Sequence, residues 1–361
     1  MVLVPEEIII NLHEVPGFGL RKVKAIIERF PDIANWNDLL RQDFARVEGI
    51  SRTLVERLEA ADPDQGMRIL ERIHEMDSRY IHYWHEDYPP LLKELYDAPV
   101  GLYMRGAGQI TADAIAVVGT RRPTDYGRLQ ARELSQALTA AGLNIVSGFA
   151  RGIDTIAHKA AIENNSCTIA VLGCGVDVIY PMENKRFYRD LLERGVAVSE
   201  YQPGTKPEGH HFPQRNRIIS GLALGTLVVE AGRGSGALIT SIHALNNGRE
   251  VFAVPGRIDS PKSSGCHQLI NEGAKLVERV EDILAELPAP YSATPGQQLD
   301  FLGDLPQPER EILEYLDGDP VIVDKIAEDL NRDISDMLVT LTYLEMKGLV
   351  IQAAGKRYAR A

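Results

Sequence analysis

Residues 115–154, IAVVGTRRPTDYGRLQARELSQALTAAGLNIVSGFARGID, decide the fold of this chain. The stretch contains a short apolar run, Ile115–Gly119, then a helical run, Gly127–Ala141, and then a second apolar run, Asn144–Ser147. Apolar runs of this length without polar alternation are typical of strands that are buried on both faces. A strand, a helix and a strand in this order predict a βαβ unit of a parallel sheet.

The same alternation extends from about residue 86 to residue 287, which we take as one domain. It predicts an α/β fold with a Rossmann-like, doubly wound and mostly parallel sheet. Ligands of such sheets bind beyond the carboxyl ends of the strands, where the strand order reverses. The further expected strands are Thr168–Leu172, Ala197–Glu200, Thr226–Glu230, Glu250–Val254 and Lys275–Val277, and the further helices are Asp154–Glu163, Lys185–Arg194, Gly236–Asn247 and Cys266–Glu272.

The regions on either side have a different pattern. Residues 1–85 contain short helical runs broken by glycine turns, which predicts an all-α N-terminal domain. The turns at Val15–Val23 and Val47–Arg52 resemble helix-hairpin-helix turns, which either bind phosphates or are purely structural. Residues 288–308 are rich in proline and glycine and predict a linker.

The tail, residues 309–361, resembles a winged-helix domain. Its third helix would enter a DNA groove if the domain read duplex sequence. That helix carries Asp336 and Glu345, and Asp333 precedes it, so a role in protein interaction is as well supported. The expected elements are helices at Glu309–Leu316, Val321–Leu330 and Ile334–Lys347, and a wing at Leu349–Ala361.

Composition limits the function classes. The 361 residues carry a net charge of -12, so any site for a polyanion must be a local basic cluster. Three widely spaced cysteines predict neither a disulfide framework nor a metal site, and no cofactor motif is complete. The chain shows no signal peptide and no apolar run long enough to cross a bilayer, so we expect a cytoplasmic protein without membrane contact.

Several predicted strands end in glycine loops that carry arginine. Small residues let a backbone approach a ligand closely, N–H groups at helix starts attract anions, and arginine matches phosphate oxygens. The glycines of a single loop can be explained by the need for a tight turn. Several such loops on one edge of the sheet predict a phosphate-binding rim. The candidate site residues are Gly119, Thr120, Arg121, Ser147, Gly148, Arg151, Lys185, Arg215, Asn216, Arg217, Gly234, Ser235 and Gly236.

The segment 212–222, FPQRNRIISGL, places Arg215 and Arg217 on either side of Asn216 near a helix start. Two guanidinium groups at a helix N-terminus predict an anion site. The alternative is that one arginine pairs with a core carboxylate such as Glu230. Phe187 or Tyr188 could stack on nucleic-acid bases, although aromatic residues on an amphipathic helix usually belong to the core.

Six motifs in this order resemble the DprA (Smf) family of DNA-processing proteins. The resemblance implies a protein that binds and protects single-stranded DNA, forms a homodimer through its Rossmann-like domain, and loads RecA recombinase during natural transformation. It assigns DNA contacts to Arg121 and Lys185 and implies no catalysis, while His210 and His211 depart from the family pattern. The motifs are VVGTR (117–121), SGFARGID (147–154), LGCGVDVIYP (172–181), FPQRNRIISGL (212–222), VVEAGRGSGALIT (228–240) and GREVFAVPG (248–256).

Two other functions fit parts of the pattern. Rossmann-like nucleotide phosphoribohydrolases also combine phosphate loops with arginine, and Glu230 would be the catalytic glutamate of such an enzyme. A sequence-specific transcription factor would use the winged-helix tail. The third glycine of the dinucleotide motif is missing after Gly175, and the chain has no P-loop sequence, which disfavours common nucleotide-dependent enzymes.

Overall fold

The computed structural model of the protein describes residues 4–44, 47–287, 307–316, 320–346, 349–353 and 356–360. The chain divides into two compact units, Met1–Thr294 and Pro295–Ala361. The predicted linker, residues 288–308, spans this division, and its part up to residue 306 lies outside the described residues.

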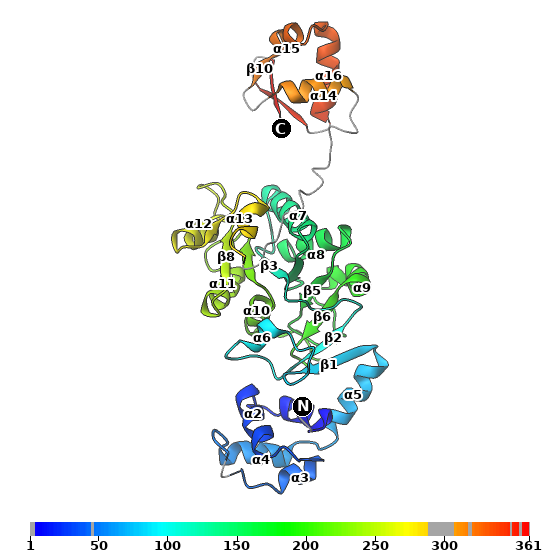
Figure 1. Ribbon diagram of the computed structural model, residues 1–361, viewed down its shortest axis with the longest axis vertical. Coiled ribbons are helices and arrows are strands. Elements are labelled where there is room, and N and C mark those ends of the chain that lie inside the picture. The colour runs from blue at the N-terminus through cyan, green and yellow to red at the C-terminus, as the bar shows by residue number, and fades with distance from the viewer. Residues whose placement is uncertain are drawn as a thin grey trace. The chain divides into compact units, whose positions relative to one another are not determined.

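The first unit is built around a nine-stranded sheet with the order β1-β2-β6-β5-β4-β3-β7-β8-β9. Figure 1 labels β1, β2, β6, β5, β3 and β8 of this sheet. The strands from β6 to β9 in this order run parallel to one another, whereas β2 is antiparallel to both β1 and β6. The chain moves outward from β3 in one direction through β4, β5 and β6, and in the other through β7, β8 and β9, so the strand order reverses at β3. The bounds are β1 Ser78–His82, β2 Gly101–Arg105, β3 Ala114–Val118, β4 Asn144–Ser147, β5 Thr168–Val171, β6 Val196–Ser199, β7 Gly225–Val228, β8 Glu250–Ala253 and β9 Lys275–Leu276.

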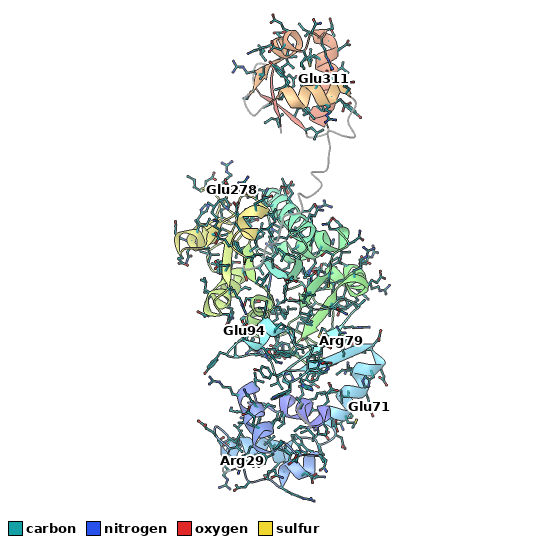
Figure 2. All side chains as sticks on the ribbon, viewed as in Figure 1. Arg29, Glu71, Arg79, Glu94, Glu278 and Glu311 are labelled. Carbon is teal, nitrogen blue, oxygen red and sulfur yellow. The ribbon has the colours of Figure 1, made fainter. Side chains whose placement is uncertain are left out.

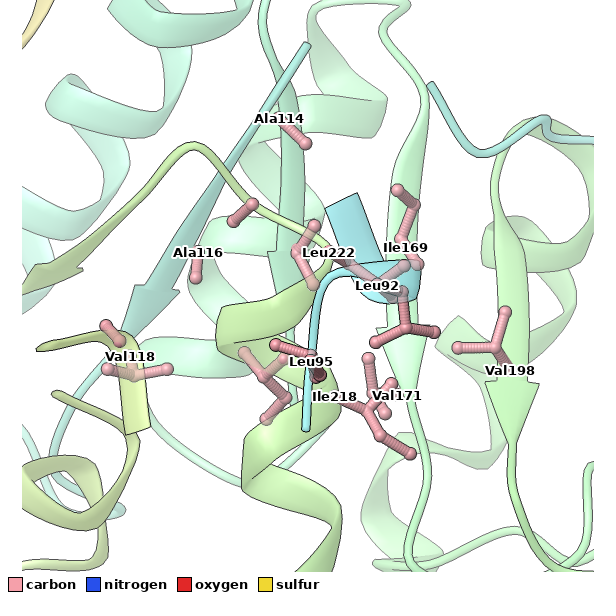
Figure 3. Packing of buried hydrophobic residues seen from close by; sticks show 14 of the residues in the cluster. Leu92, Leu95, Ala114, Ala116, Val118, Ile169, Val171, Val198, Ile218 and Leu222 are labelled. Carbon is pink, nitrogen blue, oxygen red and sulfur yellow. The ribbon is translucent and has the colours of Figure 1, made fainter. Parts of the chain in front are cut away.

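Helices cover both faces of this sheet, because side chains along each strand point alternately to either face. On one face, α6, α10, α11 and α12 pack against Ala116 of β3 and Val171 of β5, as Figure 3 shows for α10. On the other, α7, α8 and α13 pack against Val117 and Ile145. The helices are α6 Pro90–Lys93, α7 Asp125–Ala140, α8 Ile153–Glu163, α9 Lys185–Arg194, α10 His211–Gly221, α11 Gly236–Asn246, α12 Ser264–Asn271 and α13 Val280–Leu284, with a short 3-10 turn at Met182–Asn184.

The predicted doubly wound sheet is therefore confirmed. Every strand and helix expected between residues 115 and 277 is present, with bounds within two residues of the prediction. The sequence pattern predicts these strands well because they are short and buried on both faces. The apolar runs therefore coincide with the strands themselves.

The N-terminal helices form their own core, which joins the sheet at β1 and β2. Tyr80 of β1 and Tyr103 of β2 belong to this core, with ring centroids 4.9 Å apart. Gly101 makes room for the Tyr80 ring, since a Cβ at residue 101 would lie 2.2 Å from it. The helices are α1 Glu6–Glu14, α2 Leu20–Arg29, α3 Trp36–Leu40, α4 Arg52–Ala60 and α5 Gln65–Glu75.

Strand β1 corrects the expectation that residues 1–85 are purely helical. It pairs with β2 over its whole length, from Ser78 opposite Arg105 to His82 opposite Gly101. Neither strand was predicted, because each is stabilised by a partner about twenty residues away in the chain. The boundary proposed near residue 85 therefore falls after the first strand of the sheet.

The first predicted hairpin connects α1 and α2, and cationic side chains bind two of its carbonyl groups. Lys22 Nζ donates to Gly17 O at 2.7 Å, and Arg57 Nη1 donates to Pro16 O at 2.8 Å. Arg21 lies 3.6 Å from the centroid of the Tyr96 ring. Since these contacts occupy three basic side chains of the hairpin region, they favour the structural role that we considered for it.

The second unit is a winged helix, as expected. Three helices enclose a core that includes Ile326 and Leu341, and a three-stranded antiparallel sheet has the order β10-β12-β11. The elements are α14 Gln307–Tyr315, β10 Val321–Ile322, α15 Val323–Asp329, α16 Ile334–Met346, β11 Val350–Ala353 and β12 Arg357–Arg360.

Charged side chains such as Arg29, Glu71 and Glu278 point outward from the ribbon (Figure 2). Within the described ranges, no helix is both long enough and apolar enough to cross a bilayer.

Candidate nucleic-acid interface

Two adjoining cavities lie at the carboxyl ends of the central strands. The larger has a volume of about 730 Å³ and is lined by the loops after β3, β4 and β7 and by the first turns of α10 and α11. The smaller, of about 260 Å³, shares Arg121, Tyr180 and Phe212 with it. This is the edge where the strand order reverses and where the sheet topology places a ligand.

Most of the predicted site residues meet here. Arg121 and Arg215 line both cavities, so residues that are almost one hundred positions apart in the chain share one site. The lining residues that were predicted are Gly119, Thr120, Arg121, Asn216, Arg215, Gly234, Ser235 and Gly236 in the larger cavity, and Gly148 and Arg151 in the smaller.

The loop after β3 is joined to the loops after β7 and β4 by backbone hydrogen bonds. Thr120 N donates to Glu230 O at 2.7 Å, and Ile153 N donates to Thr120 O at 3.2 Å. Gly152 has a φ of +79°, and a Cβ there would lie 2.3 Å from Thr120 O, so only glycine fits this close approach. The backbone thus fixes the starting points of the Arg121 and Arg151 side chains.

Arg215 forms the floor of the site. It is 4% exposed, its Nη1 donates to Gly148 O at 2.6 Å and also to Val171 O, and its Nε has no partner among the described residues. Burial lowers the pKa of Arg215 to about 10, so the side chain is still cationic at neutral pH. It holds the loop after β4 in place and adds a buried positive charge beneath the cavity.

Asp154 lies close to this buried charge at the start of α8. Its carboxylate accepts from Gly148 N at 3.1 Å and from Ala150 N at 3.3 Å. Burial raises the pKa of Asp154, whereas the Arg215 charge and these two bonds lower it. The interaction between Arg215 and Asp154 therefore offsets part of the cost of burying both groups.

Arg217 corrects the expectation that both arginines of the segment face the ligand. Its Nη2 donates to both carboxylate oxygens of Glu200, at 2.6 and 2.8 Å, and its Nε lies 3.2 Å from Asp97 Oδ2. The side chain is 13% exposed and lines neither cavity. The alternative of a pair with a core carboxylate was correct for Arg217, but the partner is Glu200 instead of Glu230.

Ser147 and Lys185 also lie outside both cavities. The Ser147 hydroxyl donates to Val117 O at 2.6 Å inside the sheet, so it is not presented to a ligand. Lys185 is exposed at the first residue of α9. It is thus accessible to an extended ligand that continues beyond the cavities.

Sequence reasoning missed two arginines in the same loops. Arg122 lines the smaller cavity and Arg233 the larger, and both are exposed. Lys262 donates to Arg122 O and brings a further cation to this edge. Both could have been predicted from the sequence, because Arg122 is next to Arg121 and Arg233 is next to Gly234. Residues of one loop at a strand end lie at the same edge of the sheet.

The charge of the site is opposite to that of the whole chain. Of the described residues that line the two cavities, five are arginines and one, Asp154, is acidic. Arg151 is partly neutralised, because it forms an ion pair with Glu183 outside the lining. A local basic cluster of this kind is what a protein with a net charge of -12 requires to bind a polyanion.

The aromatic side chains at the site are not the ones that were considered for base stacking. Phe187 and Tyr188 are buried in a core cluster with Phe149, so the core assignment is correct. Tyr180 and Phe212 instead line both cavities, with ring centroids 5.5 Å apart, and Arg121 lies 5.9 Å from the Phe212 ring centroid. Tyr180 is 44% exposed and can therefore contact a ligand.

Glu230 has a structural role in this arrangement. Its carboxylate is buried and accepts hydrogen bonds from Thr124 N and Thr124 Oγ1, both at 2.8 Å. The Thr124 hydroxyl also caps α7 by accepting from Gly127 N. Because Glu230 is bonded to the start of α7 and does not line either cavity, the geometry gives no support to a catalytic glutamate.

The fold and the cavities define a Rossmann-like protein with an arginine-lined site at the switch point of its sheet. The chain matches the family model of DNA recombination-mediator protein A over residues 79–288 and that of the DprA winged helix domain over residues 300–356. It therefore belongs to the DprA family, and the resemblance found in the sequence is confirmed.

Relatives match over most of the chain. The protein Smf of Synechocystis is 33% identical over 96% of both chains, and the protein Smf of Escherichia coli is 40% identical over 75% of this chain and 74% of its own. The crystal structure of DprA from Streptococcus pneumoniae has a TM-score of 0.68 and 36% identity, and it covers 78% of this chain and 97% of its own. A Helicobacter pylori DprA, whose structure addresses its single-stranded DNA binding mode, has a TM-score of 0.53 and 28% identity over 58% of this chain and 95% of its own.

Proposed function

We propose that this protein binds single-stranded DNA in the two arginine-lined cavities. The observation that carries the proposal is the convergence of Arg121, Arg122, Arg151 and Arg233 above the buried Arg215 at one sheet edge. Guanidinium groups and the N–H groups of glycine loops are the donors that phosphate oxygens prefer. The Helicobacter pylori relative, which binds single-stranded DNA, supports the same class of ligand.

The aromatic pair explains why the ligand would be single-stranded. Proteins that bind single strands combine a basic groove with aromatic rings on which unpaired bases stack. Tyr180 and Phe212 line both cavities together with the arginines and supply such rings. In a duplex the base faces are already stacked, so these rings favour the single strand. Lys185 is proposed as an outer phosphate contact where the strand leaves the cavities.

The wider role follows from membership of the family. We extend the proposal to protection of the strand, its delivery to RecA recombinase, and natural transformation as the process served. A homodimer through the Rossmann-like unit belongs to the same proposal. No step in this role requires a cofactor or a catalytic residue.

The proposal is tested by fluorescence anisotropy of the full chain with a labelled oligothymidylate and with a duplex of equal length. We expect tighter binding of the single strand, with an affinity that falls as salt rises. For about four phosphate contacts the slope of log K against log salt should be roughly -3. Preference for the duplex, or an affinity that is independent of salt, would contradict the proposal.

A further inference from the structure

A cluster of metal-binding side chains lies at the start of α10, and the proposed function does not use it. Glu208, His210 and His211 each offer one ligand atom, and these three atoms lie within 4.8 Å of one another. We propose that these three residues bind a divalent transition-metal ion of the zinc class.

Neighbouring groups hold the ring of His211 in place. It is 8% exposed, its ring stacks on Tyr201 with centroids 4.0 Å apart, and its Nδ1 lies 3.2 Å from Gly173 O. A carbonyl oxygen can only accept, so Nδ1 carries the proton and Nε2 keeps the lone pair. Metal-binding histidines almost always donate their other ring N–H to such a partner, which fixes both the tautomer and the ring.

The separation of the His210 and Glu208 ligand atoms suits a tetrahedral ion. Bonds of about 2.0 to 2.2 Å from zinc to nitrogen and oxygen place two ligand atoms roughly 3.4 Å apart in a tetrahedron. His210 Nδ1 and Glu208 Oε2 are 3.5 Å apart. Both side chains are more than half exposed, so they can rotate toward His211 and an ion can reach them from solvent.

The donor set selects the kind of metal. Two imidazoles and one carboxylate are a known zinc ligand set that leaves a fourth position for water, whereas calcium and magnesium prefer oxygen donors alone. The N-terminus of α10 contributes a partial charge of about +0.5, which opposes a cation. The full negative charge of Glu208 exceeds this partial charge in magnitude.

The position of the cluster suggests a consequence for DNA binding, and this part rests on the proposed function. Gly209, between the two exposed ligands, lines the larger cavity, as does Phe212 directly after the cluster. A bound dication would be the largest single charge in this part of the rim. It would strengthen the attraction between the cavity and a phosphate backbone.

The site is tested by calorimetric titration of the full chain with Zn²⁺ in the absence of DNA. We expect His210→Ala and Glu208→Gln each to weaken zinc binding by at least about 10-fold, since each removes one of three ligands. Both residues are exposed, so the variants should fold, and a melting curve checks this. The matched control is His74→Ala, which removes an exposed histidine from the last turn of α5.

Zinc binding that is the same in the wild type, in His210→Ala and in Glu208→Gln would overturn the proposal, as would a wild type that binds no zinc. A second titration measures DNA affinity with and without Zn²⁺. We expect zinc to raise the affinity of the wild type about fivefold and to leave both variants unchanged. Zinc binding is measured without DNA, and DNA binding is also measured without zinc. Because either measurement can fail without the other, failure of the metal site is distinguishable from failure of the proposed function.

Discussion

Replacing Arg121 with alanine is expected to weaken binding of single-stranded DNA on the order of 10- to 100-fold, since a hydrogen bond to a charged group contributes about 1.5 to 3 kcal/mol. The side chain is exposed, lines both cavities and lies near the Phe212 ring, so its loss removes a phosphate donor without opening the core. Fluorescence anisotropy gives the affinity, and the salt slope should become shallower by about 0.7.

The matched control is Arg132→Ala. Arg132 forms an exposed ion pair with Glu163 between α7 and α8, so this variant loses the same charge at a place outside both cavities. Its DNA affinity should stay within about twofold of the wild type, because distant exposed charges are screened by salt. Equal losses in the two variants would show that only net charge matters, and would argue against a specific role for Arg121.

Replacing Arg217 with alanine is expected to have its largest effect on stability. The Glu200 carboxylate, which is 20% exposed, would lose the guanidinium that bonds both of its oxygens. Breaking a buried ion pair on one side costs about 3 to 5 kcal/mol, and we expect about 3 because Glu200 keeps some contact with water. Urea denaturation measures the change in the free energy of unfolding.

A double variant separates the loss of the ion pair from the cost of leaving one buried charge without a partner. Arg217→Met with Glu200→Gln should be more stable than Arg217→Ala, since no charge remains buried without a partner. Under conditions where Arg217→Ala is folded, its salt slope for DNA binding should equal that of the wild type. A slope that is shallower by about 0.7, with unchanged stability, would instead make Arg217 a phosphate contact.

The sequence predicted the sheet well because its strands are buried on both faces. In a chain that also shows helical runs of the right spacing, an apolar run such as Ile115–Gly119 has few possible structures other than a buried strand. Strands β1 and β2 were not predicted, because their stability comes from pairing with each other and from the aromatic core around Tyr80. Local sequence carries little of that information.

The site was predicted at the level of loops but not of individual side chains. Sheet topology alone brings Arg121 and Gly234 to one edge, where both line the larger cavity. The difference between Arg215 and Arg217 depends on neighbours that are distant in the chain. Arg215 meets the carbonyls of Gly148 and Val171, whereas Arg217 meets Glu200 and Asp97, and no spacing rule distinguishes these environments.

The central claim is that a DNA strand occupies the cavities at the carboxyl ends of the central strands. Backbone hydrogen exchange of the full chain, with and without a saturating oligothymidylate, tests it most directly. The account predicts slower exchange in peptides that cover residues 119–122, 148–152 and 232–236, which form the lining loops. Saturated binding that leaves exchange in all three loops unchanged would contradict it.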